Sequence, residues 1–171
     1  MIVADASVLT ALAKMQRLHL LKDLYGEAFL GPVVTMEVVD QGREIGALGV
    51  EQVEKALEAR WLRLVRLSAK ERRIMQGILR TTRLDEGEAE SLALAQSRKL
   101  TLVVDDKEGR AMAATLGTAY LGTAGVLLEG FLRGRLSFEE LEDTVQDLSR
   151  VTWLSPTVVA EILRRAREAK R

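Results

Sequence analysis

The sequence of 171 residues contains no cysteine and a single histidine, His19. The absence of cysteine excludes disulfide bonds, zinc–thiolate sites, iron–sulfur clusters and cysteine nucleophiles. One histidine excludes a metal site built from several histidines and argues against a Ser-His-Asp triad. Any chemistry performed by this chain is therefore expected to depend on carboxylates.

The sequence also lacks net charge, because 25 Lys and Arg residues balance 25 Asp and Glu residues. This balance argues against a domain coated with basic charge, but it is compatible with a local patch of either sign. There is no apolar run of the roughly 20 residues that a membrane span needs, and from the N-terminal residues we expect no targeting signal. We expect a cytoplasmic protein without a membrane partner. Asparagine is absent and Arg outnumbers Lys, which is typical of a thermophile or of a GC-rich genome.

Short apolar runs alternate with segments of helical periodicity along most of the chain. This alternation predicts an α/β protein in which a short, mainly parallel sheet is covered by helices on both faces, a three-layer α/β/α fold. Only helices are expected after the last strand, so we divide the chain into a domain at 1–135 and a helical C-terminal extension at 136–171 packed on it. Strands are expected at 1–4, 28–31, 61–67, 100–104 and 119–121, and the main helices at 7–16, 18–25, 33–41, 50–59, 88–96, 109–116, 122–132 and 137–148.

Two of the expected strands end on acidic residues, one at Asp5 and the other at Asp105 and Asp106. Ligand sites of open parallel sheets lie outside the carboxyl ends of the strands. If these strands are neighbours, Asp5 and Asp106 lie close together, which is costly unless a cation sits between them. Oxygen ligands favour Mg²⁺ or Mn²⁺ over zinc or copper.

Two further acids could join this site from predicted helices. Glu37 follows the second strand, and Glu88 opens the helix that leads into the strand at 100–104. Four carboxylates around one crevice are what a metal-dependent phosphodiester hydrolase needs, because bound metals polarise the phosphoryl oxygens and lower the pKa of water.

Four segments of the chain resemble the PIN domain, the nuclease fold of VapC-type toxins from prokaryotic toxin–antitoxin pairs. They occur in the expected order and spacing over about residues 1–125. The sequence motifs of the third and fourth segments are similar to those of a GEAE/DDxxGR branch of that family. The segments are 3–9 (VADASVL), 31–39 (GPVVTMEVV), 87–95 (GEAESLALA) and 102–107 (LVVDDK), with 121–127 (LGTAGVL) after them.

The resemblance implies a Mg²⁺- or Mn²⁺-dependent endoribonuclease that hydrolyses RNA through metal-activated water and is the toxin of a toxin–antitoxin pair. It also implies an antitoxin protein as partner and a homodimer or a higher homo-oligomer. The residues that it assigns are Asp5, Glu37, Glu88 and Asp106 as the catalytic acids, Asp5, Glu88, Asp106 and, as the alternative at the last motif, Asp105 as metal ligands, and Ser7 as the side chain that orients a carboxylate. Lys107 and Arg110 follow the last acids directly, so they could contact the phosphates of RNA or form surface ion pairs.

Two positions in this assignment remain open at the level of the sequence. Val104 stands where the family has Thr or Ser before its last acid, so Asp105 and Asp106 are alternatives, with Asp106 fitting the spacing better. Glu90 competes with Glu88, and the register of the following helix favours Glu88.

Each acid also has a simpler structural interpretation. Asp5 could be the N-cap of the next helix, Glu88 suits the positive end of a helix dipole, Glu37 could be a solvated surface acid, and Asp105 with Asp106 could form a polar turn. The same features allow a PIN-like interaction scaffold with little or no nuclease activity. A phosphatase acting on small phosphoesters is disfavoured, because Ser7 occupies the place of the second acid in an Asp-x-Asp pair.

Overall fold

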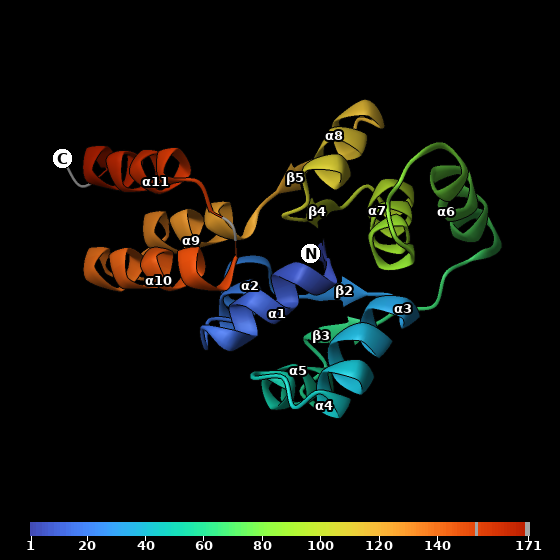
Figure 1. Ribbon diagram of the computed structural model, residues 1–171, viewed down its shortest axis with the longest axis horizontal. Helices are drawn as coiled ribbons and strands as arrows, with labels where there is room; N and C mark the ends of the chain where they lie inside the picture. The colour runs from blue at the N-terminus through green and yellow to red at the C-terminus, as the bar shows by residue number, and fades with distance from the viewer. Residues whose placement is uncertain (153, 170–171) are drawn as a thin grey trace.

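The computed structural model describes residues 1–152 and 154–169, and in this part of the chain five parallel strands form one sheet (Figure 1). The order of the strands is β3-β2-β1-β4-β5. Every neighbouring pair is parallel, so the sheet is covered by crossover helices, as parallel sheets require. The strands are β1 (Ile2–Ala4), β2 (Ala28–Leu30), β3 (Leu62–Leu64), β4 (Thr101–Val103) and β5 (Tyr120–Leu121).

Two apolar cores lie on the two faces of this sheet, which confirms the predicted three-layer fold. Successive residues of a strand point to opposite faces, so Ile2 and Ala4 of β1 join one core while Val3 joins the other. The larger core includes buried residues of α1 (Ala6–Lys14), α2 (His19–Tyr25), α5 (Val50–Glu58) and α9 (Thr123–Leu132). The smaller core is formed with α6 (Ala69–Thr81), α7 (Glu86–Arg98) and α8 (Lys107–Thr115).

The helix predicted at 33–41 is interrupted by a wider helical segment. It begins as α3 (Pro32–Thr35), continues as the π-helix η1 (Met36–Gln41) and ends as α4 (Gly42–Glu44). π-helical turns are rare and occur frequently at functional sites. Here the π-helix contains Glu37, one of the predicted catalytic acids.

The C-terminal helices pack on the sheet domain through α9. Buried side chains of α10 (Phe138–Val151) and α11 (Pro156–Ala169) belong to the larger core, and both helices contact α9 (Figure 1). Ser137 and Glu140 form a capping box at the start of α10. Of the extension predicted at 136–171, residues 153, 170 and 171 lie outside the described residues.

The strand predicted at 61–67 is shorter than its sequence pattern suggests. Only Leu62–Leu64 form β3, because this strand is at the edge of the sheet and has β2, itself three residues long, as its neighbour. Alternation of apolar and basic residues therefore continues past the point where strand pairing ends.

None of the helices within residues 1–152 and 154–169 has the length and apolar character that crossing a membrane requires.

Candidate active site

The predicted acids gather where the strand order reverses direction. From β1 the chain proceeds to β2 and β3 on one side of the sheet, whereas β4 and β5 lie on the other side. Ligand sites of open parallel sheets form at such a switch point, beyond the carboxyl ends of the strands. The Asp5 amide donates a hydrogen bond to the carbonyl oxygen of Val103 (3.1 Å), which places Asp5 at this edge between β1 and β4.

Asp5 is buried at the switch point, with 3% of its surface exposed. It occupies the N-cap position of α1, but its side chain makes no capping hydrogen bond to that helix. Instead its carboxylate accepts hydrogen bonds from two hydroxyl groups, Ser7 Oγ at 2.9 Å and Ser91 Oγ at 3.5 Å. Burial raises the pKa of Asp5 above its usual value, although the bond from Ser7 opposes this. The carboxylate of Asp5 is therefore held by side-chain hydroxyl groups at the start of α1, and one of them belongs to Ser7, the residue to which the resemblance assigns an orienting role.

Glu88 reaches the same region from the first turn of α7. It forms a capping box with Asp85, in which Glu88 Oε2 accepts from the Asp85 amide (3.0 Å) and Asp85 Oδ1 accepts from the Glu88 amide (2.8 Å). Burial, together with the negative charges of Asp85, Asp106 and Asp5, raises the pKa of Glu88 to about 7. Glu88 thus caps its helix and also faces the other acids.

Glu37 approaches the start of α7 from the π-helix. A Cβ atom added to Gly87 would lie 2.8 Å from Glu37 Oε2, so the carboxylate lies directly against the glycine in the first turn of α7. Burial is the main cause that raises the pKa of Glu37 to about 7, and the negative charges of Asp85, Asp5, Glu90 and Glu88 contribute to this value. Glu37 is therefore a member of the acidic group and not an isolated surface acid.

Asp105 and Asp106 make different contacts although they are adjacent. Asp105 directs both carboxylate oxygens at Thr123, accepting from its amide (2.8 Å) and its hydroxyl (2.5 Å) at the start of α9. Asp106 caps α8 through Gly109 (2.7 Å), and its charge is among those that raise the pKa of Glu88. The structure thus brings Asp106 to the acidic group and holds Asp105 at α9.

Glu90 holds the backbone of another helix, and its negative charge is also among those that raise the pKa of Glu37. Its side chain is buried, and Oε2 accepts hydrogen bonds from the amides of Val33 (3.0 Å) and Val34 (3.1 Å) at the start of α3. Burial raises its pKa above the usual value, and these two bonds lower it. Glu90 therefore fixes the start of the helical segment that carries Glu37.

The two predicted nucleic-acid contacts flank this group on α8. Lys107 is the first residue of α8 and is exposed, while Arg110 is half-buried one turn later. Within residues 1–152 and 154–169, neither side chain forms an ion pair. Both cations therefore have free donors close to the acidic group.

Two residues of the site were missed by sequence reasoning. Asp85 raises the pKa of Asp5, Glu37 and Glu88, so it is a fifth acid of the group. It stands three residues before Glu88, and this Asp-x-x-Glu spacing is a capping-box signal that could have revealed it. Ser91 lies one helical turn after Glu88, and its contact with Asp5 depends on the packing of α7 against β1, which no local pattern reveals.

The chemistry of these donors fits a hard divalent cation. All five are carboxylates, which Mg²⁺ and Mn²⁺ prefer, and their mutual repulsion is what a bound cation would relieve. In the part of the chain that the structure describes, no group of three or more acidic or histidine side chains is arranged as ligands of one metal ion. One oxygen of Glu88 and one of Asp106 are instead held by backbone amides.

A comparison with protein families matches this chain over nearly its whole length. The family model DUF3368, described as a PIN domain, covers residues 1–168. The chain belongs to this family of PIN domains. No curated protein and no solved structure matches the chain. The fold of this PIN domain is thus a nuclease fold, and its acidic edge lies where the sheet topology places a ligand site.

Proposed function

We propose that this PIN domain is a divalent-metal-dependent ribonuclease that hydrolyses internal phosphodiester bonds of RNA. One observation carries the proposal: the negative charges of Asp5, Asp85 and Asp106 all raise the pKa of Glu88. These four acids at the switch point of the sheet therefore form a single electrostatic group. Repulsion between these like charges lowers the stability of the fold, so stability alone does not explain why they lie close together. The repulsion is useful where a cation is to be bound.

We assign the metal to Asp5, Glu88 and Asp106, with Glu37 completing the site. These residues would hold a divalent cation, which would supply Lewis acidity to the phosphoryl oxygens of the substrate and to a water molecule. The hydroxyl groups of Ser7 and Ser91 orient the carboxylate of Asp5. The caps that hold Glu88 and Asp106 each leave the second carboxylate oxygen available for the cation. We exclude Asp105 from the ligands, because both of its oxygens bind Thr123.

The proposal is tested with a fluorescently labelled RNA, Mn²⁺ and three proteins. The natural chain is expected to cut the RNA, and Asp5→Asn is expected to lower the rate at least about a hundredfold, as removal of a metal ligand does. Asp143→Asn is the matched control, because Asp143 is exposed on α10. Equal background cleavage by all three proteins would contradict the nuclease assignment and favour a PIN-like interaction scaffold.

We further propose that the biological role is that of a toxin whose partner is an antitoxin protein. The support is the resemblance of residues 3–9, 31–39, 87–95 and 102–107 to VapC-type toxins together with membership of the PIN-domain family. Induced expression of the natural chain is expected to stop growth of a bacterial host, and expression of Asp5→Asn is not. Normal growth in both cases would contradict the toxin role while leaving the nuclease assignment untouched.

A further inference from the structure

The neutral net charge of the chain hides a strong local excess of positive charge. Residues 60–83 contain eight Arg and Lys side chains and a single acid, Glu71. Glu71 is buried and is neutralised by Arg98, with an ion-pair distance of 2.8 Å. Because the whole chain is neutral, the remaining residues carry a matching excess of acid. Charge is therefore segregated, and α6 with its flanks is the basic part.

Three of these cations form a row on one face of α6. Lys70, Arg73 and Arg80 are spaced by three and seven residues, so they lie on the same side of the helix. All three are exposed, whereas the opposite side, with Ile78, is packed in the smaller core. The row extends over roughly 15 Å at 1.5 Å per residue.

The stability of α6 does not explain this row. The positive end of the helix dipole disfavours cations in the first turns, where Lys70 and Arg73 stand, and like charges three residues apart repel each other. In the described residues, 1–152 and 154–169, the side chains of Lys70, Arg73 and Arg80 form no ion pair that would offset the repulsion.

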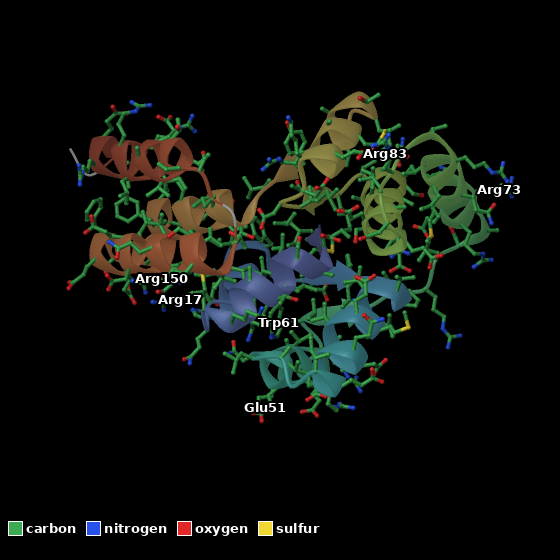
Figure 2. The ribbon with its side chains drawn as sticks, in the orientation of Figure 1. Arg17, Glu51, Trp61, Arg73, Arg83 and Arg150 are labelled. Atoms are coloured by element: carbon green, nitrogen blue, oxygen red, sulfur yellow. The ribbon has the colours of Figure 1, made fainter. Side chains whose placement is uncertain are left out.

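The row leads directly to the acidic edge. α6 and α7 are antiparallel, since Glu71 near the start of α6 pairs with Arg98 at the end of α7. The end of α6 is therefore next to the start of α7, where Asp85 and Glu88 lie. Arg83 continues the row between them, and its amide donates to Glu108 Oε1 of α8 (2.9 Å). In Figure 2, Arg73 and Arg83 lie on the α6 side of the molecule.

We propose that the exposed face of α6, defined by Lys70, Arg73, Arg80 and the adjoining Arg83, binds the phosphate backbone of the RNA strand next to the cleavage site. This inference rests on the proposed ribonuclease function and adds where its substrate lies. An edge with five carboxylates repels a polyanion, so the strand needs cations outside this edge to hold it there. A row of about 15 Å spans roughly four phosphates of a stacked strand at 3.4 Å per step.

The test compares two triple variants of equal charge change. The α6 variant is Lys70→Glu, Arg73→Glu and Arg80→Glu. The control variant is Lys22→Glu, Arg135→Glu and Arg150→Glu, which also replaces one Lys and two Arg at exposed positions. Figure 2 places Arg150 on the α10 side of the molecule, at the opposite end from Arg73. Circular dichroism checks that both variants are folded.

Binding is measured by fluorescence anisotropy with a labelled 20-nucleotide single-stranded RNA of mixed sequence, in EDTA so that no cleavage occurs. The α6 variant is expected to bind roughly tenfold or more weakly than the control variant. Its plot of log affinity against log salt is expected to be less steep by about 2, because each lost phosphate contact on a single strand removes about 0.7. Equal weakening in both variants would overturn the proposal.

Cleavage in Mn²⁺ separates this inference from the proposed function. The α6 variant is expected to hydrolyse bis(p-nitrophenyl) phosphate, which is too small to reach α6, at the natural rate, while its KM for the RNA rises. If the natural chain cuts RNA and the α6 variant behaves like the control variant, the inference fails and the ribonuclease stands. If the natural chain neither binds nor cuts RNA, the proposed function fails and the inference fails with it.

Competition then distinguishes RNA from an acidic protein. Unlabelled RNA is expected to displace the labelled strand at a much lower concentration of charge than poly-L-glutamate does. Equal displacement by poly-L-glutamate would overturn the assignment to RNA and would identify the α6 face as a general anion surface.

Discussion

The carboxylate of Glu90 occupies the space that the missing side chain of Gly31 leaves open. A Cβ atom on Gly31 would lie 2.1 Å from Glu90 Cδ, far inside van der Waals contact. From this position Glu90 accepts hydrogen bonds from the amides of Val33 and Val34. These are two of the donors that the first turn of a helix leaves without partners. Glycine at 31 and glutamate at 90 are therefore one structural unit, and this unit sets where the Glu37 segment begins.

The substitution Gly31→Ala is expected to destabilise the protein. The new methyl group displaces the Glu90 carboxylate and leaves buried amides unpaired, at a cost of about 1–3 kcal/mol. For a chain of this size that lowers Tm by roughly 2–12 °C. Gly77→Ala is the control, because a Cβ atom there meets nothing within 4 Å and alanine favours a helix by about 0.5–1 kcal/mol. A Tm for Gly31→Ala at or above that of the natural chain in a thermal melt would contradict the coupling.

In a chelator, Asp5→Asn is expected to raise Tm by roughly 2–4 °C, equivalent to about 1 kcal/mol. The substitution removes one buried negative charge from a group of like charges, and the amide can still bond with the Ser7 hydroxyl. Added Mn²⁺ is expected to raise Tm of the natural chain and to have little effect on the variant. Asp143→Asn is expected to leave Tm nearly unchanged. A clear drop in Tm for Asp5→Asn would show that its charge stabilises the fold.

The metal-free protein is expected to lose stability as pH rises from 5 to 8. Glu37 and Glu88 have pKa values of about 7 in the folded chain, against an ordinary value of 4.5. Between these values the folded state binds more protons than the unfolded state, so its stability decreases as pH increases. The pKa of Glu71 is lowered to about 2 by Arg98, so Glu71 changes the stability of the fold only at pH values below this range. Thermal melts in a chelator measure the slope, which Glu88→Gln should reduce. An unchanged slope in that variant would contradict the shared charge of the acidic group.

Asp105→Asn and Asp106→Asn are expected to have different effects. Titration calorimetry with Mn²⁺ should show binding to Asp105→Asn close to that of the natural chain, and at least about tenfold weaker binding to Asp106→Asn. Asp105→Asn should instead lower Tm, because its two bonds to Thr123 hold the start of α9. The opposite pattern of metal binding would make Asp105 the ligand and Asp106 only the cap of α8.

The layers of the fold could be predicted because the relevant forces are local. Short apolar strands ending at Asp5 and Asp106 alternate with helices, and this pattern leaves few arrangements other than a covered parallel sheet. A capping box also marks the start of a helix by local contacts alone, and the structure has such a box at Ser68 and Glu71. The end of β3 was predicted wrongly, since pairing at an edge depends on the length of the neighbouring strand.

The sequence left open which individual acids belong to the site, because this depends on the direction in which each side chain points. Glu88 and Glu90 are two residues apart on one helix, so their side chains point to different neighbours. Local sequence cannot say that Glu88 faces Asp106 while Glu90 faces the start of α3. The π-helix at Glu37 is likewise invisible in a pattern that fits an ordinary helix.

The sequence by itself determined that carboxylates are the chemical groups available, that they follow parallel strands, and that the chain has the segments of a PIN domain. Composition excludes thiol and multi-histidine chemistry, and the alternation of strands and helices follows from short-range periodicity. Only the tertiary structure decided which acids share one electrostatic field, which ones cap helices, and that the cations of α6 adjoin the acidic edge. These relationships arise because the order of the strands brings Asp5 and Asp106 together across a hundred residues, and no local pattern encodes that distance.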